Sequence, residues 1–101
     1  MRMMLTARFP TESFNDLVRN GEAGPLMQSI LAELKPEAVY FTDDCGERTA
    51  VLIIDMEKAS DLPKFVEPFF LKFNADCDLR VVMSPEDLAG AGLAELGKKW
   101  G

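Results

Sequence analysis

Hydrophobic positions recur with two different periods along the chain. Four short segments rich in β-branched and aromatic residues have the pattern of strands. Between and after them, apolar residues recur at helical spacing, as Met27, Ile30, Leu31 and Leu34 do. The predicted strands are residues 3–9, 37–42, 48–56 and 78–83, and the predicted helical segments are 11–18, 25–34, 60–73 and 84–100.

This order of elements predicts an α+β domain over residues 1–101. The order βαββαβ followed by a C-terminal helix is that of the ferredoxin-like split βαβ arrangement. We expect an antiparallel sheet with the strands in the spatial order 4-1-3-2 and the helices on one face. The third strand carries a continuous apolar run over residues 50–54. Such a run indicates that both faces of this strand are covered.

Alternation divides the strand residues between two faces. The set assigned to the helix-covered face is apolar throughout: Met3, Leu5, Ala7, Ala50, Leu52, Ile54, Leu79, Val81 and Met83. The other set is mixed: Met4, Thr6, Arg8, Tyr40, Thr42, Val51, Ile53, Asp55, Arg80 and Val82. The centre of this second face is too apolar for bulk water. We therefore expect a second copy to cover it, giving a two-fold dimeric barrel.

The amino-acid composition limits which ligands, cofactors and reactions the chain can support. The chain has 11 basic and 17 acidic residues, a formal charge of −6, and no histidine. An acidic domain is a poor partner for nucleic acid or anionic membranes. The lack of histidine removes the commonest general base, zinc ligand and haem ligand. We expect no cofactor and no metal site. No apolar run is long enough to span a bilayer, and no signal-peptide pattern is present, which predicts a cytoplasmic protein.

The candidate ligand-binding residues are the polar ones of the second face: Thr6, Arg8, Tyr40, Asp55 and Arg80. Two arginines in a barrel would suit a small acidic or carbonyl-bearing molecule, because the guanidinium fork matches a carboxylate. Asp55 or Tyr40 would then be the candidate acid or base. This interpretation takes the first strand as parallel to the third, which brings Arg8 and Asp55 to one end. The alternative is that these two residues simply pair with each other.

Two other features each allow two interpretations. The phenylalanines at 65, 69, 70 and 73 share a helical stripe that either packs in the core or walls a cavity. The last helix carries Gly90, Gly92 and Gly97, so its intrinsic stability is low and it needs a surface to dock on. We expect Trp100 to anchor it, within the chain or across a dimer.

Several phrases resemble uncharacterised bacterial proteins of the dimeric α/β-barrel superfamily, over about residues 1–88. These phrases are Thr6–Pro10, Lys35–Phe41, Glu67–Phe70 and Ser84–Leu88. The resemblance implies a ferredoxin-like subunit and a homodimer formed through the open sheet face. The superfamily hosts many unrelated functions, so the resemblance implies no particular reaction.

These observations favour a homodimeric domain that binds a small, acidic molecule in its barrel without catalysis. One alternative is an enzyme of the isomerase or monooxygenase type that uses no metal and acts on a small aromatic or enol compound. Another is a structural or regulatory assembly module. Whether the chain is an enzyme stays open at this point.

Overall fold

The sheet has four antiparallel strands in the spatial order β2-β3-β1-β4. The structure is a computed structural model, and it describes all 101 residues. The elements are, in chain order, β1 (Arg2–Arg8), α1 (Thr11–Arg19), α2 (Ala23–Leu34), β2 (Ala38–Asp44), β3 (Glu47–Asp55), the short 3₁₀ helix η1 (Ala59–Asp61), α3 (Leu62–Phe73), β4 (Asp76–Val81), α4 (Pro85–Ala89) and α5 (Leu93–Trp100).

The α+β class and the 4-1-3-2 strand order are confirmed, and the arrangement is compatible with a ferredoxin-like fold. The expected parallel relation between the first and third strands is wrong. The connection through α1 and α2 returns the chain so that β2 runs in the direction of β1. The tight turn after Asp44 then reverses it, so β3 runs antiparallel to β1.

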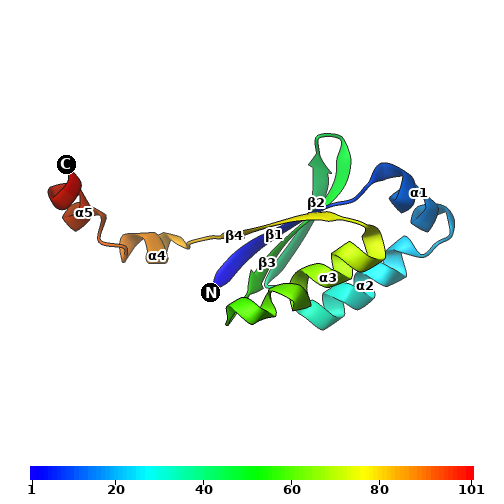
Figure 1. The fold of residues 1–101 in the computed structure, drawn as a ribbon, viewed down its shortest axis with the longest axis horizontal. Helices are drawn as coiled ribbons and strands as arrows, with labels where there is room; N and C mark the ends of the chain where they lie inside the picture. The colour runs from blue at the N-terminus through cyan, green and yellow to red at the C-terminus, as the bar shows by residue number, and fades with distance from the viewer.

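The core lies between the sheet and the helices α2 and α3, which cover one of its faces (Figure 1). Residues that alternate along β1 and β3 supply the sheet side: Met3, Leu5, Ala7, Ala50, Leu52 and Ile54 are buried. The helices supply Met27, Ile30, Leu34, Phe65, Val66, Phe69 and Phe73. The face assignment from the sequence is therefore confirmed for the two central strands.

The helices begin and end where local chemistry requires it. Gly21, with a φ of 73°, makes the break between α1 and α2. Lys35 and Asn74 end α2 and α3 in the left-handed conformation common at helix C-termini. The helix α3 continues through Pro68, and three of its four phenylalanines are buried. The core interpretation of that stripe is correct for all but Phe70, which is partly exposed.

The end of β4 differs from the prediction. Val81 and Met83 belong to the set expected beneath the helices, yet both are exposed, at 60% and 61%. The reason is that the chain runs on past the edge of the helical layer (Figure 1). No helix lies over these two side chains to bury them.

The C-terminal arm, residues 85–101, leaves the body of the molecule. Gly90 and Gly92 divide the expected single helix into α4 and α5. Every residue of the arm is exposed. The arm points away from the sheet and accounts for much of the 59 Å length of the chain (Figure 1).

Candidate functional site

The open face of the sheet, the one without helices, carries all five residues predicted to form a site. The register places Tyr40, Val51, Thr6 and Asp78 in one row across the four strands. Arg80 lies one row further, directly opposite Met4. Thr6, Tyr40 and Arg80 therefore share this face, but Tyr40 and Arg80 lie on its opposite edge strands, and Val51 separates Tyr40 from Thr6.

Arg8 is on the same face but is already engaged. Its Nε donates to Asp44 at 2.6 Å, and its Nη2 donates to Asp78 at 2.5 Å. These two hydrogen bonds hold the pKa of Arg8 above its usual range, and the one to Asp44 is the chief cause that lowers the pKa of that carboxyl. The positive charge of this guanidinium is therefore already paired with two carboxylates of its own chain. It is poorly placed to bind an external acid.

Asp55 lies at the opposite end of the face from Arg8, which corrects the expectation that they meet. The register pairs Asp55 with Arg2, and Arg8 with Thr49. Asp55 accepts a hydrogen bond from the N-terminal ammonium at 2.9 Å, and this contact lowers its pKa. The predicted Arg8–Asp55 pair does not form, because β1 and β3 run in opposite directions. A lowered pKa also makes Asp55 a weak base.

A cavity lies on the other side of the sheet, at the end that carries the β2–β3 hairpin. Its volume is about 390 Å³, within the usual range for small-molecule sites. Its walls are mostly apolar and come from α1, α2, the hairpin strands and the residue that directly follows β1: Phe9, Phe14, Ala23, Gly24, Met27 and Phe41. The polar lining residues are Thr42, Arg48 and Thr49.

One polar group of this cavity, the Arg48 guanidinium, lies against its aromatic wall. The Arg48 guanidinium lies 4.9 Å from the centre of the Phe14 ring. Phe14 in turn packs on Phe9, with ring centres 5.0 Å apart. Arg48 makes no ion pair with a carboxylate of this chain. An apolar pocket with one arginine free to bind a carboxylate is suited to a planar acid.

Sequence reasoning missed this cavity. Its lining residues are scattered from position 9 to position 49, and no local motif joins them. The sequence assigned Phe9 only to a predicted strand and Phe14 only to the apolar stripe of a predicted helix. The available signal was the helix break after residue 20, which moves α2 away from α1 and brings Ala23 and Gly24 to the cavity wall.

A search against protein-family models finds no match, and no curated protein is similar to the chain. Among the helices, none has both the length and the apolar character required to cross a membrane.

Proposed function

We propose that this chain is a small-molecule-binding protein whose ligand is a planar, apolar acid held in the aromatic cavity. The observation that carries the proposal is the position of Arg48, unpaired and stacked over Phe14 at an apolar pocket. The pocket would bury the ring of the ligand, and the guanidinium would bind its carboxylate. Binding without catalysis is favoured, because no lining residue is a nucleophile paired with a base.

This site replaces the barrel interior as the place for the ligand. Arg8, one of the two arginines on which the barrel site depended, already binds Asp44 and Asp78. Arg80 remains without an ion pair but lies on an exposed sheet face rather than in a cavity. Arg48 and Arg80 both lack an ion pair, so they are the two alternative binding residues for the same acid.

Binding of 2-naphthoate, followed by titration calorimetry, tests the site. Arg48→Met should weaken binding about tenfold, the usual effect of losing one charge-assisted hydrogen bond. Gly24→Phe should abolish binding, because a Cβ at Gly24 meets no atom within 4 Å and the added ring can fill the cavity. Arg80→Met, the matched control, should bind as the unaltered chain does. Loss of binding in Arg80→Met alone, or no binding in any variant, would overturn the proposal.

The second part of the proposal is a homodimer formed through the open face. Tyr40 is 68% exposed there, and Val51, Ile53 and Met4 extend the apolar area across the sheet. A two-fold dimer uses one self-complementary surface, and this face is a partly apolar one that no helix covers. The resemblance to dimeric α/β-barrel proteins agrees with this proposal.

Native mass spectrometry tests the assembly with two adjacent residues. Tyr40 and Phe41 have similar exposure, 68% and 60%, but lie on opposite faces of the edge strand β2. Tyr40→Glu should give the mass of a single chain, whereas Phe41→Glu should keep the mass of two. A single-chain mass for the unaltered protein would contradict the dimer.

A further inference from the structure

The strand β4 is an edge of the sheet, and one side of its backbone has no partner. Its pairing with β1 continues to Val82, whose N–H donates to the carbonyl of Arg2 at 3.2 Å. The direction of the backbone groups alternates along a strand of an antiparallel pair. Even-numbered residues of β4 therefore bond to β1, and Cys77, Leu79 and Val81 direct their N–H and C=O groups outward. Such a free edge can pair with another strand.

The ends of this free edge are set by the residues on either side of it. Asn74, with a φ of 52°, ends α3 in the left-handed conformation, so the extended backbone begins after it. Ser84 caps α4 and Pro85 follows, and a proline has no N–H to donate to a further ladder bond. The segment available for pairing therefore runs from residue 75 to residue 83, and its midpoint is Leu79. A two-fold pairing centred on Leu79 uses the whole segment.

The charges along β4 favour the same centre. In an antiparallel pair centred on Leu79, Asp78 of each copy lies directly opposite Arg80 of the other, at a position without backbone hydrogen bonds, where opposed side chains are closest. Arg80 has no ion pair within its own chain. Asp78 accepts from Arg8 through Oδ2, which leaves Oδ1 for a second guanidinium. A centre at Asp78 or at Arg80 would instead set that charge opposite itself, which is unfavourable.

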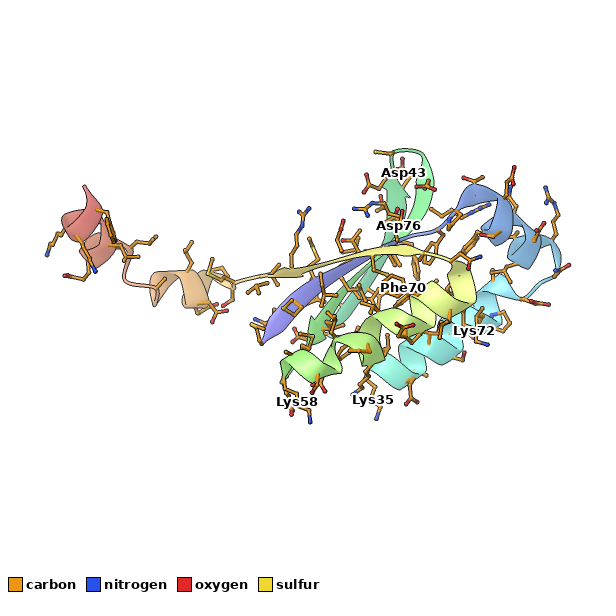
Figure 2. All side chains as sticks on the ribbon, viewed as in Figure 1. Lys35, Asp43, Lys58, Phe70, Lys72 and Asp76 are labelled. Carbon is orange, nitrogen blue, oxygen red and sulfur yellow. The ribbon has the colours of Figure 1, made fainter.

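The apolar residues at the end of β4 also fit this pairing. Val81 and Met83 belong to the set that alternates toward the helical side, yet they are 60% and 61% exposed because no helix of their own chain covers them. In this pairing they lie opposite the partner's Cys77 and the partner's Ala75, which are packed in or against the core of that copy. Figure 2 labels Phe70, 39% exposed, between α3 and β4. The partner's α3 therefore supplies the cover that Val81 and Met83 lack.

We infer that β4 of one copy pairs antiparallel with β4 of a second copy, with Leu79 at the two-fold axis. This inference rests on the proposed homodimer and specifies which edges of the two sheets join. The open faces still pack on each other, because a two-fold axis that crosses the strands between two facing sheets brings like edges together in opposite directions. The contacts between Asp78 and Arg80 then lie inside the barrel, and the α3 helices of both copies lie outside it.

Disulfide trapping with the native Cys77 tests this register. Opposite Cα atoms at a hydrogen-bonded antiparallel position lie about 5.5 Å apart, within the range that a disulfide spans. In a Cys45→Ser background, Val81→Cys should therefore oxidise, with a copper catalyst, to a covalent dimer joined between Cys77 of one copy and position 81 of the other. Positions 77 and 81 of one chain lie roughly 13 Å apart along the strand and cannot join each other. Peptide mapping identifies the linkage.

Met83→Cys is the matched control, because Met83 has nearly the same exposure as Val81 but lies opposite residue 75 of the partner. Its Cα would be about 8 Å from that of the partner's Cys77, so it should give about tenfold less covalent dimer. Equal trapping in the two variants would overturn the register. A covalent dimer of Val81→Cys that persists when Cys77→Ser is added would also overturn it, because position 81 would then lie opposite itself.

Two further measurements separate the possible results. Arg80→Glu sets two carboxylates opposite each other and should reduce trapping by Val81→Cys several-fold, whereas Lys35→Glu, on the helical layer (Figure 2), should not. Equal trapping in these two variants would refute the ionic contact that sets the register. In native mass spectrometry of the unaltered protein, a two-chain mass without trapping in Val81→Cys would leave the homodimer standing and refute the β4 pairing. A single-chain mass would refute both.

Discussion

Arg8 on the central strand β1 donates a hydrogen bond to Asp78 on the edge strand β4, and the two atoms lie 2.5 Å apart. The same guanidinium binds Asp44, at the far end of β2. One side chain therefore ties both edges of the sheet to its centre, at the end where the hairpin turns. Arg8 therefore has a structural role. Because its donors are already engaged, the candidate ligand site is the cavity at Arg48 instead.

The Arg8–Asp44 contact should make stability fall in acid. The pKa of Asp44 is lowered in the folded state, chiefly by the hydrogen bond from Arg8. Its contribution is therefore complete above the unfolded-state pKa of about 4 and is lost as the pH falls through the lower folded pKa. Asp44→Asn should lower Tm by a few degrees at pH 7, and the difference should vanish near pH 2.

The neighbouring Asp43 supplies the control for this measurement, because it forms no ion pair. Thermal unfolding followed by circular dichroism between pH 2 and 7 would compare the variants. Equal pH profiles for Asp43→Asn and Asp44→Asn would show that the contact with Arg8 contributes nothing.

The aromatic core should dominate stability. Phe69 is completely buried, and its ring packs beside those of Phe9 and Phe73. Phe69→Ala should lower the free energy of unfolding by about 3–5 kcal/mol, as large-to-small changes in cores do. Phe70→Ala, one position along and 39% exposed, should cost much less. Urea titration measures both, and similar losses would disprove this assignment of the core.

A substitution in the hairpin turn should raise the stability of the protein. Cys45 and Gly46 both have positive φ, 53° and 82°, as tight two-residue hairpin turns require. A cysteine tolerates this region poorly, whereas asparagine is among the residues that adopt it most readily. Cys45→Asn should raise the free energy of unfolding by about 0.5–1 kcal/mol. Gly46→Ala should lower it, and the opposite order of the two variants would contradict the turn geometry.

The two thiols should differ in reactivity. Burial, reinforced by Asp76 and Asp78, raises the pKa of Cys77 to about 11, so little thiolate forms at neutral pH. Cys45 is exposed. Limited iodoacetamide at pH 8 should label Cys45 at least tenfold faster, as mass spectrometry of the intact protein and its peptides would show. In urea the two cysteines should be labelled at equal rates, which provides the reference. Equal rates in the folded chain as well would rule out the predicted difference in reactivity.

The fold was predictable where a pattern is local. Alternation in β1 and β3 assigned Leu5, Leu52 and their neighbours to the covered face, because every second residue of a strand points the same way. The strand order followed from the order of the elements. Val81 was misassigned because alternation says which way a side chain points, but not whether a helix reaches far enough to cover it.

The candidate site was less predictable because it depends on strand direction and on contacts distant in sequence. One wrong direction, that of β3 relative to β1, placed Asp55 beside Arg8 instead of at the opposite end. The partners of Arg8 lie 36 and 70 positions away, and no periodicity links them. The cavity at Arg48 likewise requires four elements to be in place before it exists.

The position of β1 also determines the order in which the protein can fold during synthesis. This first strand to be made is central, and its neighbours are β3 and β4, which come tens of residues later. Its apolar side chains have no neighbouring strand until residue 55 has been made, and the second neighbour is complete only at residue 81. Such distant pairing slows folding. Translation therefore produces a central strand first and completes the sheet around it last. Chaperone binding to residues 2–8 would be most valuable during this period.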